Sequence, residues 1–206
     1  MFCALLQRCA YADLIAYYSF NATNAIADVG SAISAFAFQN PGGVSTSFVG
    51  GTAQNVQSGF LAGRALSQDH WLGSTNCFQF TLDATAWQDV IVSYAWERSS
   101  TGPANGIFQY SLSGSAGSFV DFATNGVPIL FTGAGGVVTQ DLSVVTAIDG
   151  NSTIAFRIVG IGASQSGGVL HLDNFTVNAV SIPEPSAVVL AGLGSAVALL
   201  LWRRRR

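Results

Sequence analysis

Few side chains in this 206-residue chain are suited to acid–base or nucleophilic chemistry. The two histidines are His70 and His171, and no Cys-x-x-Cys, His-Glu-x-x-His or Gly-x-Ser-x-Gly motif occurs. Glycoside hydrolysis ordinarily requires two carboxylates across a cleft, and Glu97 is the only glutamate before residue 182. The inventory therefore predicts a protein that is not an enzyme. The alternative is a secreted hydrolase or lyase that acts on polysaccharide through aspartates that no motif marks.

Asp69-His70-Trp71 is the first candidate for a ligand-binding site. It combines a carboxylate, an imidazole and an indole in an expected loop, and loops on a rigid scaffold often carry binding residues. A turn with a packed tryptophan is the alternative interpretation. The surface around Trp71, Trp87 and Trp96 decides between them, because exposed rings favour sugar binding and buried rings do not.

Trp96 is the second candidate, because it stands at the end of an expected strand directly before Glu97 and Arg98. Its ring could stack on a sugar while the polar pair bonds to hydroxyl groups. In the alternative interpretation these two charged residues, with Asp173 and Arg157, supply a strand-edge ion pair that holds a loop. An isolated arginine in a strand, such as Arg157, most often pairs with a carboxylate or lies over the sheet surface.

No motif calls for a cofactor, and calcium is the one metal ion with a candidate position. Asp173-Asn174 offers the carboxylate and amide oxygens that suit calcium. One such pair falls far short of the roughly 6–8 oxygen ligands that calcium takes. We therefore expect these two side chains to interrupt strand pairing through hydrogen bonds to the backbone.

Charge is distributed unevenly along the chain, whose formal net charge is −3. There is no lysine, and four of the eight basic residues are the last four, Arg203, Arg204, Arg205 and Arg206. Residues 1–181 carry four arginines against ten acidic residues, a net charge of −6. Nucleic acid is not an expected partner, because its binding depends on basic residues that neutralise phosphates.

An uninterrupted apolar run, residues 187–202, precedes the final arginines and ends at Trp202. As a helix it would be about 24 Å long, short for a bilayer core of about 30 Å. The span would be effectively longer with Trp202 at the membrane interface and the arginine side chains extended outward. We predict one C-terminal transmembrane helix with the arginines in the cytoplasm. This orientation places residues 1–181 on the other side of the membrane, outside the cytoplasm. A buried core helix is the alternative.

Pro183-Glu184-Pro185 lies shortly before the apolar run. Each proline blocks helix propagation and favours an extended predecessor, so Glu184 is expected in a short exposed segment beside the membrane. The motif, the run and the arginines, in this order, resemble the PEP-CTERM sorting signal of outer-membrane bacteria. The resemblance implies recognition by exosortase, a membrane-embedded cysteine transpeptidase. It also implies removal of the helix, so that the inner membrane is a transient anchor, and delivery to the cell surface or extracellular matrix.

Residues 1–12 are interpreted as the remnant of an N-terminal signal peptide. Ala10-Tyr11-Ala12 has the small-x-small pattern of a signal-peptidase site, which would leave Asp13 first. The apolar stretch Phe2 to Leu6 is shorter than the about 7–15 residues of a signal core. An ordinary N-terminal helix or strand is the alternative.

Residues 13–181 predict an all-β domain, an antiparallel β-sandwich, followed by the sorting segment 182–206. Alternating apolar and polar residues between Gly-, Ser- and Asn-rich turns mark many short strands. The expected strands are Leu14–Phe20, Cys77–Leu82, Val90–Arg98, Gly106–Ser113, Ser118–Phe122, Gly136–Leu142, Thr153–Ile161 and Val169–Val180, with shorter ones among residues 30–75.

Segments such as Ala155-Phe156-Arg157-Ile158 and Leu172-Asp173-Asn174-Phe175-Thr176-Val177 also resemble ectodomains that often precede this sorting signal. Those ectodomains are jelly-roll sandwiches of the carbohydrate-binding or concanavalin-like type. The resemblance implies a jelly-roll-like fold for residues 13–181 and extracellular polysaccharide as a partner.

Overall fold

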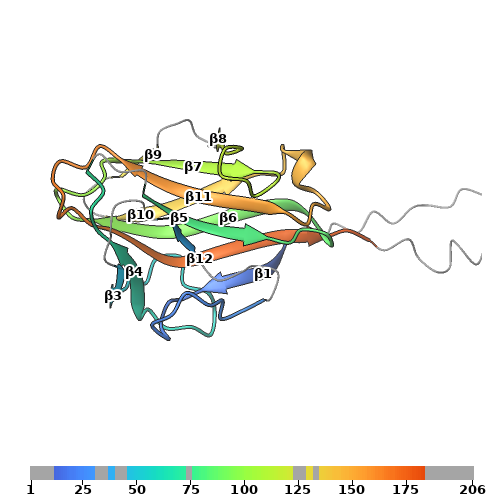
Figure 1. The fold of residues 1–206 in the computed structure, drawn as a ribbon. Coiled ribbons are helices and arrows are strands. Elements are labelled where there is room, and N and C mark those ends of the chain that lie inside the picture. Colours follow the sequence, from blue (N-terminus) through green and yellow to red (C-terminus); the bar gives the residue numbers. More distant parts are fainter. Residues whose placement is uncertain are drawn as a thin grey trace, which may run out of the picture.

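The computed structural model describes residues 12–30, 37–39, 46–72, 76–122, 129–131 and 135–183. Two antiparallel sheets lie face to face, which confirms the predicted β-sandwich (Figure 1). The helix predicted for residues 187–202 lies outside the described residues, and so does the interpreted signal remnant apart from Ala12.

Sheet A has the strand order β10-β6-β12-β4-β3, with β1 also paired with β12. β12 is its central strand, because β6, β4 and β1 all pair with it. The strands are β1 (Asp13–Tyr18), β3 (Thr46–Gly50), β4 (Arg64–Gln68), β6 (Trp87–Arg98), β10 (Gly136–Asp141) and β12 (Leu170–Ser181).

Sheet B has the strand order β2-β5-β11-β7-β8, with β9 also paired with β7. Its strands are β2 (Ala37–Gln39), β5 (Cys77–Leu82), β7 (Asn105–Ser111), β8 (Val120–Phe122), β9 (Ile129–Leu130) and β11 (Ile154–Ile161). All eight strands expected from the sequence are present, with ends that differ by a few residues at most. The short 3-10 helix η1 (Thr146–Ile148) is the one helical element of the described residues.

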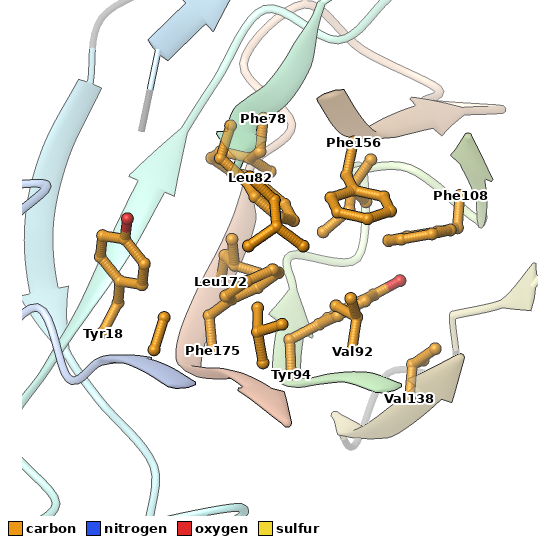
Figure 2. Close-up of a cluster of buried hydrophobic side chains, with 14 of the residues drawn as sticks. Tyr18, Phe78, Leu82, Val92, Tyr94, Phe108, Val138, Phe156, Leu172 and Phe175 are labelled. Atoms are coloured by element: carbon orange, nitrogen blue, oxygen red, sulfur yellow. The ribbon is translucent and has the colours of Figure 1, made fainter. Parts of the chain in front are cut away.

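Aromatic side chains from both sheets fill the space between them (Figure 2). Phe175 of β12 lies edge-on to Phe80 of β5, with 4.3 Å between ring centroids. Phe80 also contacts Phe156 of β11, at 5.2 Å. Burial of such a ring contributes roughly 1.5–3 kcal/mol, and a ring pair about 0.5–1.5 kcal/mol more. The packing fixes which face of each strand remains outside.

A bulge at Asp173 and Asn174 reverses the facing of β12. Leu170 and Leu172 point into the core before it, and Phe175 and Val177 do so after it. The register with β6 shifts between Asp173 and Thr176, and Asn174 has a φ of 46°. Asparagine tolerates this left-handed conformation better than most residues. The bulge therefore keeps both halves of a long strand packed on one core.

The sandwich has two ends. We call one the tail end, where β12 finishes beside residues 83–87 and 149–151. The other, the far end, carries residues 69–72, 99–104 and 162–169, which are joined by backbone hydrogen bonds from His70 to Ser166 and from Ser164 to Thr101. The chain leaves the sandwich at the tail end, on the right of Figure 1.

Candidate functional site

The last strand runs directly into the predicted sorting segment. Ser181, the last residue of β12, is paired with Trp87, and the Ile182 N–H donates to the Ala86 carbonyl oxygen at 2.8 Å. Pro183 follows and is exposed. Glu184, Pro185, Trp202 and Arg203–Arg206 lie outside the described residues. Within the part of the chain that the structure describes, no helix is both long and apolar enough to span a membrane.

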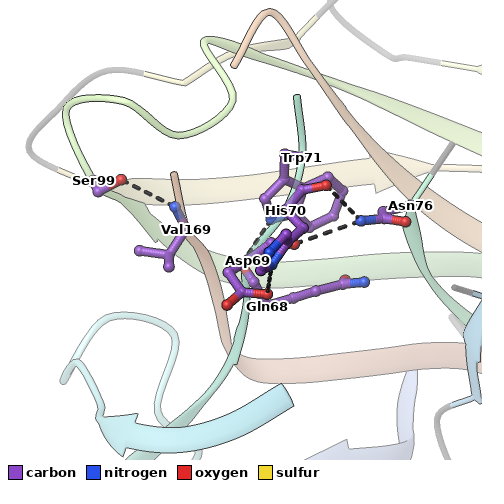
Figure 3. Close-up of polar contacts among 7 residues, drawn as sticks. All are labelled: Gln68, Asp69, His70, Trp71, Asn76, Ser99 and Val169. Atoms are coloured by element: carbon purple, nitrogen blue, oxygen red, sulfur yellow. Dashed lines mark hydrogen bonds and ion pairs between the residues drawn. The ribbon is translucent and has the colours of Figure 1, made fainter. Parts of the chain in front are cut away.

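Asp69 and His70 lie together in a loop at the far end (Figure 3). Asp69 Oδ1 is 2.6 Å from His70 Nδ1, and the two side chains are 23% and 49% exposed. His70 has a φ of 58°. The Asn76 side-chain amide donates to the His70 carbonyl oxygen at 2.9 Å, which holds the loop. The structure thus brings this predicted pair to the surface, where it can meet a ligand.

Trp71 and Trp96 are core residues, at 2% and 5% exposure. The Trp71 indole N–H donates to the Gln68 carbonyl oxygen at 2.7 Å, and its ring packs against Phe78. Trp96 packs against Phe131, with 4.5 Å between ring centroids. Neither ring presents a face to a sugar in this arrangement, so the packed-tryptophan alternative describes the geometry.

The interpretation of a strand-edge ion pair is wrong for the arginines, because carbonyl groups take the place of the carboxylate. Arg98 Nε donates to the Phe131 carbonyl oxygen at 2.9 Å, and Nη1 donates to that of Gly102 at 3.0 Å. Among the described residues no arginine lies within ion-pair distance of a carboxylate, and the Asp69–His70 contact is the one pairing of a carboxylate with a basic side chain. Arg98 therefore ties far-end loops together, as expected, but without a charged partner.

Glu97 lies opposite His171 in the pairing of β6 with β12. Burial lowers the pKa of His171, and the nearby Glu97 carboxylate acts in the opposite direction. His171 Nδ1 is buried and has no hydrogen-bond partner in the part of the chain that the structure describes. The neutral imidazole is thus a structural member of sheet A.

Four polar side chains lie at one register across the outer face of sheet B. They are Gln79 of β5, Arg157 of β11, Gln109 of β7 and Asp121 of β8, which we call the polar row. The Arg157 neighbours Phe156 and Ile158 are buried in the core, and strand alternation therefore directs Arg157 outward.

Hydrogen bonds connect three of the four members of the polar row. Arg157 Nε donates to Gln109 Oε1, and Gln109 Nε2 donates to Asp121 Oδ1 at 2.5 Å. The Arg157 guanidinium carbon also lies 4.0 Å from the centroid of the Phe119 ring, a cation–π contact. The Arg157 terminal nitrogens bond to none of the described residues. The row thus offers donors and acceptors at fixed spacing beside a half-buried aromatic ring.

The polar row had no signal in the sequence beyond the isolated Arg157. Its members are separated by up to 78 residues, from Gln79 to Arg157, and only the strand pairing brings them to one register. Pairing register depends on which strands neighbour each other, and alternation within a strand does not reveal that.

Asp173 and Asn174 bond to the backbone, as the sequence indicates. Asp173 accepts from the Thr52 N–H and the Asn174 N–H, both at 2.7 Å. Burial raises the pKa of Asp173 to about 6, although these two hydrogen bonds act in the opposite direction. Among the described residues no group of three or more His, Cys, Asp or Glu could hold a metal ion. Calcium binding at this pair stays a prediction.

Residues 181–206 match the PEP-CTERM protein-sorting motif. The motif indicates an exported protein whose membrane-anchored precursor is sorted to the cell surface. Comparison with curated proteins finds no match.

Solved structures of carbohydrate-binding modules are similar to this chain, and the first two described below, with TM-scores above 0.5, share its fold. The xylan-binding domain CBM22-1 of Xyn10C from Paenibacillus barcinonensis is 12% identical with a TM-score of 0.51, over 85% of this chain and 100% of that one. The CBM22-1-CBM22-2 tandem of the same protein is 13% identical with a TM-score of 0.54, over 86% of this chain and 48% of the tandem. The family 11 carbohydrate-binding module of Lic26A-Cel5E from Clostridium thermocellum is 9% identical with a TM-score of 0.46, over 87% and 99%. At these identities the likeness concerns the fold.

Proposed function

We propose that this exported protein is processed by exosortase and acts, without catalysis, as a polysaccharide-binding protein of the cell surface or extracellular matrix of an outer-membrane bacterium. The observation that carries the proposal is the PEP-CTERM motif at residues 181–206, which continues directly from the last strand of a β-sandwich. The combination of a sandwich and a sorting motif in one chain favours a protein that functions after export.

The sorting half of the proposal assigns Pro183, Glu184 and Pro185 as the segment that exosortase recognises and the inner membrane as a temporary anchor. Replacing Glu184 by Ala should block processing and leave the protein in the inner membrane, because it removes the only charge in the extended segment. Cell fractionation and immunoblotting would follow the two forms. Normal processing and surface delivery of the variant would contradict this role.

The binding half of the proposal assigns the polar row as the site that binds polysaccharide. Hydroxyl-rich ligands need several donors and acceptors at fixed positions, and Arg157, Gln109 and Asp121 supply them. The half-buried Phe119 adds an apolar surface beside the guanidinium. The fold shared with a xylan-binding domain supports the assignment, although it does not identify the sugar.

The test is a pull-down with matrix polysaccharide and a set of purified plant and bacterial polysaccharides. Replacing Arg157 by Gln should weaken binding about tenfold, since hydrogen bonds to a charged group contribute about 1.5–3 kcal/mol. Arg64→Gln is the matched control, because Arg64 is an exposed arginine on sheet A whose Nη1 donates to a backbone carbonyl. An equal loss of binding in both variants would indicate a general charge effect and would contradict the assignment of the polar row as the binding site.

The same incubations test for catalysis. Release of reducing ends would support the alternative of a hydrolase, and formation of unsaturated products would support a lyase. Asp69 and His70 remain a second proposed contact with the ligand, at the far end. His70→Ala should leave binding unchanged if the polar row is the whole site and should weaken it if the far-end loop contributes.

A further inference from the structure

A cavity of about 460 Å³ opens at the tail end, away from both proposed contacts with polysaccharide. Its lining residues are Leu14, Ile15, Gly30, Asp83, Thr85, Ala86 and Trp87. The volume lies within the range of about 300–1,000 Å³ that is typical of small-molecule sites. We call it the Trp87 cavity.

A bulge in β6 directs Trp87 toward this cavity. Val90 and Val92 point into the core, and simple alternation from them would place Gln88 inside and Trp87 outside. Asp89 has a φ of 53°, and the register between β6 and β12 shifts beside it. The extra residue reverses the facing, so Trp87 packs partly against the core while it lines the cavity.

The rim of the cavity is polar and anionic. Asp83 is fully exposed, and its Oδ1 accepts from the Thr85 hydroxyl at 2.6 Å and from the Thr85 N–H at 3.0 Å. Its second oxygen bonds to none of the described residues. The hydrogen bonds from the Thr85 hydroxyl and N–H lower the Asp83 pKa, which keeps this carboxylate charged at neutral pH.

The remaining walls are apolar or formed by backbone. Leu14, Ile15 and Ala86 supply apolar surface. Gly30 has a φ of 83°, and a Cβ there would lie 1.8 Å from the Ile15 carbonyl oxygen. Only glycine therefore allows this wall to lie so close to β1. None of the described lining residues is basic.

These features select one class of ligand. An indole and aliphatic side chains suit the C–H face of a pyranose ring. The Asp83 oxygen can accept hydrogen bonds from sugar hydroxyls, and its charge disfavours ligands that carry a carboxylate or phosphate. We propose that the Trp87 cavity binds a neutral pyranose ring. This site is separate from the polar row and does not depend on it.

The test is an NMR titration of the full chain in detergent with methyl β-D-glucopyranoside and, in parallel, with D-glucuronate. The probe is the Trp87 indole N–H resonance, which is assigned by its loss in Trp87→Phe. The neutral glycoside should shift it saturably with a Kd on the order of 1 mM. Glucuronate should bind about fivefold more weakly, because like charges a few ångströms apart in water repel.

Asp83→Asn supplies the decisive variant, because the side chain is fully exposed and its replacement should not disturb folding. The variant should remove most of the difference between the two ligands, a change that a purely structural role for Asp83 would not produce. Glu97→Gln, which removes the charge of an exposed carboxylate outside both the cavity and the polar row, is the matched control and should leave both titrations unchanged.

The lack of any shift of the Trp87 resonance in the folded protein would overturn the proposal. Equal affinity of the unmodified chain for both ligands would overturn it as well. A response that disappears in Asp121→Asn but persists in Asp83→Asn would also refute it, since the sugar would then bind the polar row. The polysaccharide assay depends on Arg157 and the titration on Trp87, so either proposal can fail while the other stands.

Discussion

The hydrogen bonds of Asn174 join β12 to the loop that follows β3, and their removal should destabilise the sandwich strongly. Asn174 Nδ2 donates to the carbonyl oxygens of Thr52 and Gln54, at 2.8 and 2.9 Å. Its Oδ1 accepts from the Tyr17 hydroxyl at 2.6 Å. The residue is 1% exposed, so its replacement by Ala leaves three polar groups without these partners.

The size of the effect follows from the groups involved. Each polar group that stays buried without a partner costs about 1–3 kcal/mol, and a left-handed backbone costs Ala about 1–2 kcal/mol. The two loop carbonyls are partly buried and can recover some bonding to water. We therefore expect Asn174→Ala to lower the free energy of unfolding by about 3–5 kcal/mol. Asn174→Gly should cost about 1 kcal/mol less, because glycine accepts the φ of 46°.

Urea unfolding followed by tryptophan fluorescence measures these differences. With a denaturant slope of about 2 kcal/mol per molar, the midpoint for Asn174→Ala should fall by roughly 1.5–2.5 M. Tyr17→Phe removes the hydroxyl that donates to Asn174 and also bonds to the Gln57 backbone, and it should cost about 1–2 kcal/mol. Its effect should shrink when Asn174 is already Gly, because only the bond to Gln57 then remains to be lost. The reasoning would be refuted if both Asn174 variants stayed within about 0.5 kcal/mol of the unmodified chain.

Three further predictions concern single buried groups. Tyr94 is fully buried and its hydroxyl has no hydrogen-bond partner among the described residues. Tyr94→Phe should therefore raise the free energy of unfolding by about 1 kcal/mol in the same urea assay, and destabilisation would contradict this. The folded-state pKa of Asp173, about 6, exceeds its ordinary value of 3.8. The folded state therefore binds more protons between these values, and the free energy of unfolding should fall by up to about 3 kcal/mol as pH rises from 4 to 7. Asp173→Asn should lack this fall. If stability of the variant changed with pH in the same way as that of the unmodified chain, Asp173 would not be its cause. A Cβ at Gly160 would lie 2.7 Å from the Trp71 ring, so Gly160→Ala should lower the free energy of unfolding by about 1–3 kcal/mol. Gly50→Ala is the control, because the space around Gly50 is open and no such clash is expected.

The strands of the sandwich were predictable because alternation is a local property of the chain. Val90, Val92, Tyr94 and Trp96 share the core face that their spacing predicts. Alternation did not predict the positions of the bulges. Simple alternation cannot place Trp87, because the extra residue at Asp89 reverses the facing of β6. Bulge positions depend on the partner strand as much as on the bulged residue.

The candidate site was less predictable than the fold. An aromatic residue beside polar neighbours looks the same in sequence whether its ring is exposed or packed. Trp71 is packed because Gly160 leaves room for its ring, and that glycine is 89 positions away. The polar row depends in the same way on strands that are distant in sequence. His70 could be placed correctly at the surface because loop position is a local property.

The sandwich and the sorting motif overlap at Ser181 and Ile182, directly before Pro183. The motif match begins at Ser181, yet Ser181 is still paired with Trp87, and the Ile182 N–H still bonds to Ala86. Proline has no N–H to donate, so it cannot extend this pairing as its predecessors do. Pro183, the first residue of Pro-Glu-Pro, therefore cannot continue the backbone hydrogen bonding of β12 and its Ile182 extension. Removal of the chain beyond it would leave every strand pair of β12 in place.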